Sequence, residues 1–110
     1  METNYVKVAE KSEIPAGTMK AAKINGKNIV VANVNGNYYA IGMDCTHSGG
    51  DLSKGTLDGT IVTCPRHHAK FDVINGKLVS PPKMGLFHPK ANDETTYQVK
   101  VDQENILVKP

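Results

Sequence analysis

Three Asn-Gly dipeptides, at positions 25–26, 35–36 and 75–76, each lie between two short runs of alternating apolar and polar residues. Asparagine and glycine adopt the positive φ angles of two-residue hairpin turns more readily than other residues do. The pattern therefore predicts three β-hairpins. A chain of 110 residues that contains three hairpins is expected to be built mainly from antiparallel sheet.

Short alternating runs bounded by turn residues extend through the rest of the chain, which is typical of an all-β domain. Strands are predicted at Tyr5–Ala9, Met19–Ile24, Asn28–Val34, Tyr38–Met43, Thr60–Thr63, Ala69–Val73, Lys77–Ser80, Tyr97–Asp102 and Asn105–Lys109. Pro15 and Gly17 predict a loop after the first strand, because neither residue suits a strand interior. No segment of ten or more residues has a helical period, so at most one helical turn is expected, at Gly50–Lys54.

The length of the chain predicts a single domain, and its composition divides that domain into two parts. Residues 43–82 are richer in Gly, Pro, Cys and His than their flanks, and we interpret them as a small loop-bearing subdomain that buries little apolar area. Residues 1–42 and 83–110 are expected to form an antiparallel base, a β-sandwich or a barrel-like sheet. Lys83–Thr96 has little alternation and is expected to cross the surface irregularly, either as a partner surface or as an insertion.

The charge pattern excludes several classes of partner. The formal net charge is +2, and 13 basic residues are interleaved with 11 acidic ones, so no basic stripe suits a nucleic acid. Eighteen consecutive apolar residues and a basic leader are both absent from the sequence, so we expect a cytoplasmic protein without a membrane anchor. Two cysteines in such a compartment are not expected to form a structural disulfide.

Both cysteines and three of the four histidines lie in two short stretches, Cys45-Thr46-His47 and Cys64-Pro65-Arg66-His67-His68. Thiolate and imidazole are the side chains that best suit iron, zinc and copper, and two loops that each carry such a pair can converge on one metal site. A zinc finger groups its cysteines and histidines differently, whereas each loop here offers one sulfur and one nitrogen. A zinc site of this order stays open, and blue copper fits less well.

The two Cys/His stretches, with Ala69-Lys70-Phe71-Asp72 and Asn75-Gly76 after them, resemble the signature of Rieske ferredoxins. The resemblance is close over about residues 38–82 and implies an antiparallel β base with a small cluster-binding subdomain. It also implies one Rieske-type 2Fe-2S cluster, with Cys45 and Cys64 on one iron and His47 and His67 on the other.

The identity of the second histidine ligand depends on the register of the motif. His68 stands where the family often has glycine. The Cys-x-x-His spacing favours His67 as the ligand, and His68 stays open as an alternative ligand, a residue that supports a ligand, or a surface residue.

The resemblance implies one-electron transfer, in which the cluster receives an electron from a flavoprotein reductase and passes it to a terminal oxygenase or another oxidoreductase. A small Rieske subunit of a nitrite-reductase-like complex and a structural zinc module are the alternatives. A complete Rieske oxygenase needs a further iron site with two histidines and a carboxylate. Only His68 and His88 remain for it, in a chain of 110 residues that is too short for the catalytic domain. We therefore expect an electron carrier rather than an enzyme.

Four positions depart from the high-potential branch of the family. Gly50 and Arg66 replace two cysteines that form a disulfide there, and Ala69 and Phe71 replace a serine and a tyrosine whose hydroxyls hydrogen-bond the cluster. Such hydrogen bonds favour the reduced cluster, so their loss predicts a low reduction potential.

Overall fold

The structure is a computed structural model that describes residues 5–43, 51–65, 68–80 and 93–109. Its strands are β1 (Val6–Glu10), β2 (Met19–Ile24), β3 (Lys27–Val34), β4 (Asn37–Gly42), β5 (Thr56–Asp58), β6 (Ile61–Thr63), β7 (Lys70–Asp72), β8 (Leu78–Ser80), β9 (Thr96–Tyr97), β10 (Val99–Asp102) and β11 (Asn105–Val108). Two single-turn 3-10 helices, η1 (Lys11–Glu13) and η2 (Leu52–Lys54), are the only helical segments within the described ranges. The predicted all-β fold is confirmed, and η2 forms within the predicted turn, but the expectation of at most one helical turn was wrong, because η1 is a second one.

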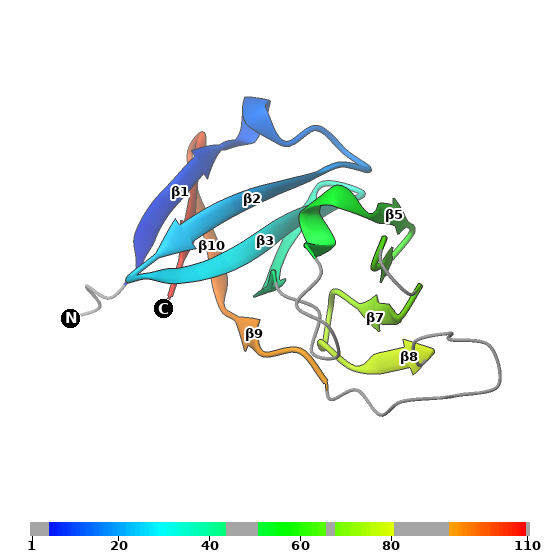
Figure 1. The fold of residues 1–110 in the computed structure, drawn as a ribbon. Helices are drawn as coiled ribbons and strands as arrows, with labels where there is room; N and C mark the ends of the chain where they lie inside the picture. Colours follow the sequence, from blue (N-terminus) through cyan, green and yellow to red (C-terminus); the bar gives the residue numbers. More distant parts are fainter. Residues whose placement is uncertain (1–4, 44–50, 66–67, 81–92, 110) are drawn as a thin grey trace, which may run out of the picture.

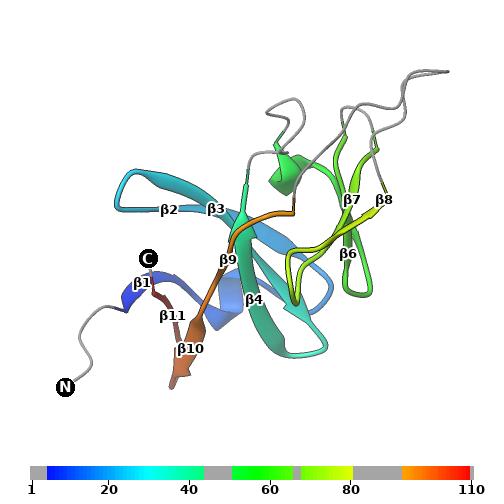
Figure 2. The same ribbon diagram turned by 90° about the horizontal axis from the view of Figure 1, so that it is seen from below.

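The strands form three antiparallel sheets, in the orders β1-β11-β10, β2-β3-β4-β9 and β5-β6-β7-β8. The first two sheets make up the base, and the third, which we call the tip sheet, comes from residues 56–80 (Figure 1). From below, β4 lies between the first sheet and strands β6, β7 and β8 of the tip sheet (Figure 2). The middle sheet therefore separates the other two.

Strand β3 is buried on both faces, which explains why its residues 29–33 read as an uninterrupted buried run. Ile29 and Val31 pack in one buried cluster with Ile106 and Val108 of β11. Val30 and Ala32 point to the opposite face, because successive strand residues alternate. They belong to a second cluster with residues of the tip, by which we mean η2, the tip sheet and their connections. The domain thus has two hydrophobic clusters, one on each side of the β2-β3-β4-β9 sheet.

The tip buries more apolar surface than the sequence predicted. Leu52, Val62, Phe71 and Val73 are each at most 1% exposed and share a cluster with the base. Strand β5 was not predicted, because its three residues lie between Gly55 and Gly59 and are too short to show a period. The expectation that residues 43–82 bury little apolar area was wrong, because apolar side chains alternate along the short strands and face the base.

Two of the three predicted hairpins have the expected two-residue turns. Asn25-Gly26 joins β2 to β3 and Asn35-Gly36 joins β3 to β4, and all four residues have positive φ. The third connection, between β7 and β8, is longer than predicted. Gly76 alone of that pair has a positive φ, and Asp72 accepts hydrogen bonds from the N–H groups of Ile74 and Gly76.

The predicted strand Tyr97–Asp102 is divided between two sheets. Tyr97 pairs with Ala40 of β4, whereas Val99 pairs with Val108 of β11. Between them, the carbonyl oxygen of Gln98 accepts a hydrogen bond from the N–H of Lys109. The chain changes sheets at this residue, which local alternation does not reveal.

Residues 93–95, where the chain returns from the tip to the base, join these two parts. The side chain of Asp93 accepts a hydrogen bond from the N–H of Leu78, and the N–H of Glu94 donates to the carbonyl oxygen of Gly76. On the other side, the N–H of Gly42 donates to the carbonyl oxygen of Thr95. The predicted irregular crossing is described only from residue 93 onward.

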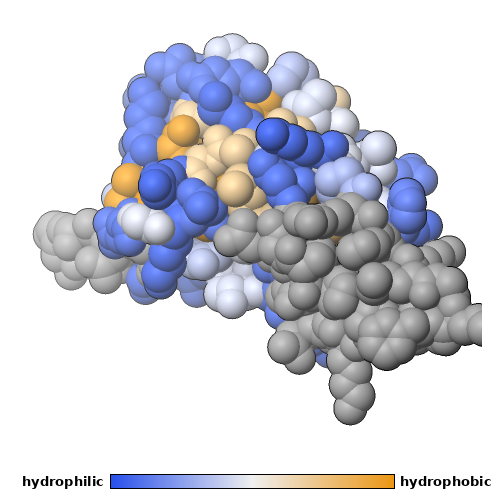
Figure 3. Space-filling model, in the orientation of Figure 1, coloured by the Kyte–Doolittle hydropathy of each residue, from blue (hydrophilic) through white to orange (hydrophobic). Residues whose placement is uncertain are grey.

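Polar side chains surround the apolar areas of the base. The face in Figure 3 shows an apolar area near strands β1 and β2 that is bordered by polar residues. Strand β2 lies at the edge of its sheet and exposes Lys20 and Lys23, which discourage pairing with another chain. Among the described residues, none of the helices has the length and apolar character needed to cross a membrane.

Candidate functional site

The first Cys/His loop is closed at its base by a backbone hydrogen bond. The N–H of Leu52 donates to the carbonyl oxygen of Met43 at 2.9 Å, and the N–H of Met43 donates to Asn28 of β3 at 3.1 Å. Cys45 and His47 lie between these two anchoring residues in the sequence, outside the described residues. Both ends of the loop are therefore fixed to the base.

The second Cys/His loop is closed in a similar way. The N–H of Cys64 donates to the carbonyl oxygen of Ala69 at 2.8 Å, and the carbonyl oxygen of Cys64 accepts a hydrogen bond from the N–H of His68 at 3.1 Å. Cys64 is fully buried and has a free thiol. His67 lies outside the described residues, as does His88.

The anchoring residues of the two loops lie in one buried cluster. Leu52 from the first loop and Cys64 and Ala69 from the second are all fully buried there, against Val30 and Ile41 of the base. The backbones of η2 and β6 are also in close contact, because a Cβ atom at Gly55 would overlap the carbonyl oxygen of Thr63. The bases of the two loops are therefore close together in space, although they are separated in the sequence.

His68 has an unusual backbone conformation. Its φ is +64°, in the left-handed region that glycine adopts without strain, and its side chain is exposed. Glycine would therefore adopt the backbone conformation of this position with less strain than histidine does. Within the described ranges, no residue forms a hydrogen bond with the imidazole of His68, so its role stays a prediction.

Ala69 and Phe71 are both fully buried in the cluster that contains Cys64. Phe71 lies opposite Val62 in the β6-β7 pair, and neither Ala69 nor Phe71 carries a hydroxyl group. Ala69 and Phe71 therefore contribute apolar surface to the cluster that buries Cys64. A low-dielectric environment of this kind strengthens any nearby electrostatic interaction.

Asp51 and Gly55 support the two loops. Asp51 caps η2, because its carboxylate accepts hydrogen bonds from the N–H and the hydroxyl group of Ser53. The Asp-x-Ser pattern was the available signal, since aspartate often accepts from the second residue after it. The contact between Gly55 and Thr63 had no local signal at all.

The predicted metal ligands fall mostly outside the described residues. Cys64 is the one predicted ligand inside them, and Cys45, His47 and His67 lie outside. No group of three or more His, Cys, Asp or Glu side chains gathers within residues 5–43, 51–65, 68–80 and 93–109. The four-residue ligand set therefore stays a prediction.

Comparison with known proteins gives a consistent result. Residues 4–89 match the family described as Rieske [2Fe-2S] domain. The ferredoxin component of the naphthalene 1,2-dioxygenase/salicylate 5-hydroxylase systems of Ralstonia sp is 35% identical over 109 residues, which cover 99% of this chain and 98% of that protein.

Solved structures resemble the whole chain as well. The ferredoxin of carbazole 1,9a-dioxygenase from Nocardioides aromaticivorans IC177 has a TM-score of 0.87 at 28% identity, over 98% of this chain and 99% of that one. A chain from the complex of reduced oxygenase and oxidized ferredoxin in carbazole 1,9a-dioxygenase has a TM-score of 0.82 at 27% identity, over 98% and 94%. The similarity therefore includes both the base and the tip.

Proposed function

The chain belongs to the Rieske [2Fe-2S] domain family, and from this premise we propose that Cys45, His47, Cys64 and His67 hold its cluster. The observation that carries the proposal is the shared buried cluster at the bases of the two Cys/His loops, which contains Leu52, Cys64 and Ala69. Because the end of the first loop and both ends of the second share this cluster, the sulfur and nitrogen donors of the two loops are available to one site.

The donor set fits a Rieske-type 2Fe-2S cluster. Two thiolates and two imidazoles are the ligands of this group, with the histidines replacing cysteines on one iron. When bound, the cluster supplies a reversible one-electron couple. Burial of Cys64 excludes water from its thiolate, and the hydrogen bonds between Cys64, His68 and Ala69 hold its backbone in place.

The protein is a one-electron carrier that exchanges electrons with other proteins. Full-length similarity to ferredoxin components of dioxygenase systems, and to a ferredoxin found in a complex with its oxygenase, supports this function. We propose a flavoprotein reductase as the electron donor and a terminal oxygenase as the acceptor. We also propose that the chain itself forms and breaks no substrate bond, because only His68 and His88 remain for a separate catalytic iron site, and His68 directly follows the proposed cluster ligand His67.

We further propose that residues 43–82 form the cluster-binding subdomain and that residues 1–42 and 83–110 form the base. The tip sheet lies entirely within the first range, and all its described strand pairs are internal. The two parts share one hydrophobic cluster, so we expect them to unfold together rather than as independent domains.

Electron paramagnetic resonance of the anaerobically purified, dithionite-reduced protein, with iron and sulfide analysis, tests the proposal. We expect two irons and two sulfides per chain, and a rhombic signal with an average g below that of all-cysteine 2Fe-2S proteins. The variants Cys64→Ser and His67→Ala should lose or alter the signal, whereas the control His88→Ala should retain it. A silent protein with stoichiometric zinc would show instead that the site is structural.

A further inference from the structure

The outer face of the tip sheet separates charges along its strands. The row of paired residues nearest to Cys64 consists of Thr56, Thr63, Lys70 and Ser80. Two residues further along the strands, about 7 Å away, the corresponding row contains Asp58, Ile61 and Asp72. The exposed lysine therefore lies at the end of the sheet that leads into the Cys64 loop, and the two aspartates lie at the opposite end.

Lys54 adds a second positive charge at the same end. It is the exposed last residue of η2. Gly55, which follows it, is packed so closely against the carbonyl oxygen of Thr63 that no Cβ atom fits between them. Since Thr63 precedes Cys64 and pairs with Lys70, the backbones of Lys54 and Lys70 lie on either side of the strand that enters the loop.

The acidic residues of the described tip do not neutralise the positive charge of Lys54 and Lys70. At the cluster end, Asp51 is half-buried and its carboxylate accepts hydrogen bonds from Ser53, so among the described residues two exposed lysines face one partly shielded aspartate. At the opposite end, Asp58 is exposed, and Asp72, like Asp51, is half-buried and accepts a hydrogen bond, here from the N–H of Ile74. These two aspartates outnumber Lys77, which lies in the β7-β8 connection. The described tip thus has a positive end beside Cys64 and a negative end away from it.

We propose that Lys54 and Lys70 form a cationic docking rim that receives an acidic surface of the redox partner protein. The inference deepens the function proposed above and rests on it, because the rim has a role only if electrons leave near the Cys64 loop. An oriented charge pair at an interface accelerates encounter and selects complementary partners more than it adds to affinity. The rim would therefore set which protein docks and how fast.

Stopped-flow oxidation of the reduced holoprotein by ferricyanide tests the rim without knowledge of the natural partner. Each ferricyanide ion takes one electron from the reduced protein and becomes ferrocyanide, and its three negative charges imitate an acidic surface. The double variant Lys54→Gln/Lys70→Gln should react about five- to twenty-fold more slowly than the wild-type protein at about 10 mM ionic strength. The difference should shrink to less than about twofold at 1 M salt.

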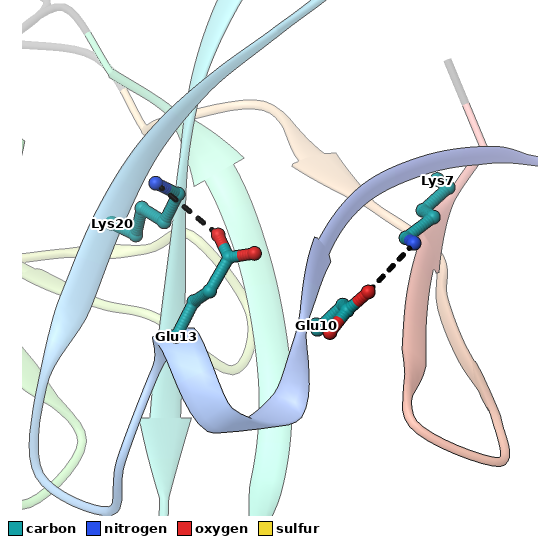
Figure 4. A network of polar contacts seen from close by, with 4 residues as sticks. All are labelled: Lys7, Glu10, Glu13 and Lys20. Atoms are coloured by element: carbon teal, nitrogen blue, oxygen red, sulfur yellow. Dashed lines mark hydrogen bonds and ion pairs between the residues drawn. The ribbon is translucent and has the colours of Figure 1, made fainter.

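The control is the double variant Lys7→Gln/Lys100→Gln, which changes the net charge by the same amount. These lysines lie on the first base sheet, across the middle sheet from the tip; Lys7 forms an exposed ion pair with Glu10 (Figure 4), and Lys100 lies over the ring of Tyr5. Their removal should alter the ferricyanide rate by less than about twofold, because they are more distant from the Cys64 loop. The variant Lys54→Arg/Lys70→Arg keeps the charges and should retain the wild-type rate.

Equal slowing in the rim and control variants, or no slowing in the rim variant, would overturn the docking rim and leave electron transfer intact. A cationic oxidant such as tris(phenanthroline)cobalt(III) should show the opposite order, with the rim variant reacting faster than the wild-type protein. Absence of a reducible chromophore in the wild-type protein would overturn both the rim and the proposed function, so the two failures are distinguishable.

Discussion

The backbone N–H of Cys64 donates a 2.8 Å hydrogen bond to the carbonyl oxygen of Ala69, and this contact closes the second Cys/His loop directly above the tip sheet. Below it, Phe71 of β7 and Val73, which follows the strand, are buried against the base. The loop and the sheet are thus held by different interactions, and they should respond differently to loss of the cluster.

Removal of the cluster should open the loops and leave the tip sheet folded. In hydrogen exchange of the apoprotein, the amides of Leu52 and Cys64, which close the two loops, should lose protection by about tenfold or more, equivalent to about 1.4 kcal/mol. The amide of Val73, which donates to Thr60 within the sheet region, serves as the control and should stay protected. Loss of protection at all three amides would contradict the prediction and show that the cluster holds the whole tip.

Hydroxyl groups beside Cys64 should raise the reduction potential. Ala69→Ser and Phe71→Tyr each add a hydroxyl near the cluster, where a hydrogen bond favours the reduced form. A bond worth about 1.4 kcal/mol corresponds to about 60 mV for a one-electron couple. Voltammetry of both variants measures the shift, and Ala40→Ser, a buried alanine in the other hydrophobic cluster, is the matched control. An equal potential in all variants would refute the predicted cause of the low potential.

Replacement of His68 by glycine should stabilise the protein. The left-handed conformation at φ +64° strains a residue that has a Cβ atom, so His68→Gly should raise the free energy of unfolding by up to about 1 kcal/mol. His68→Ala removes the imidazole and keeps the strain, so its melting temperature should not rise. Both variants should keep the paramagnetic signal of the wild-type protein. Loss of the signal in both variants would contradict the prediction and indicate His68, rather than His67, as a ligand.

The contact between Gly55 and Thr63 should tolerate no side chain. Gly55→Ala places a methyl group against the carbonyl oxygen of β6, which should destabilise the protein by about 1–3 kcal/mol and disturb the adjacent loop. Gly59→Ala is the control in the same sheet, because beyond its chain neighbours no described atom lies within 4 Å of the place its methyl group would take, and only its positive φ opposes the change. Chemical denaturation and cluster absorbance measure the two effects. A larger loss of stability in Gly59→Ala would contradict the packing argument.

Asn33 should stabilise the base without influence on the cluster. Its buried amide donates to the carbonyl oxygen of Ile14 at 2.7 Å, and its side-chain oxygen accepts from the N–H of Gly36 at 2.8 Å. Asn33→Ala leaves both groups without this partner and should cost about 2–4 kcal/mol of unfolding free energy. The exposed Asn28 provides the control variant Asn28→Ala, which should cost less than about 1 kcal/mol. An altered reduction potential in Asn33→Ala would show that the base and the cluster are coupled.

Local chemistry was sufficient to predict much of the fold. Strand β2 matches its predicted bounds, and the hairpins at Asn25-Gly26 and Asn35-Gly36 have the predicted turns, because alternation and positive φ are properties of a few adjacent residues. The Cys/His stretches could also be predicted, since the sequence itself gives the types of the sulfur and nitrogen donors and their spacing. The ligand set itself stays a prediction.

Long-range packing decided the remainder. The sequence by itself determined which segments form strands and which residues offer sulfur and nitrogen to a metal. Only the tertiary structure placed Leu52 in the same buried cluster as Cys64, moved the chain to another sheet at Gln98 and filled the tip with apolar contacts. The physical reason is that each of these features depends on burial against residues far away in the sequence, and a local pattern contains no information about which distant surface will cover it.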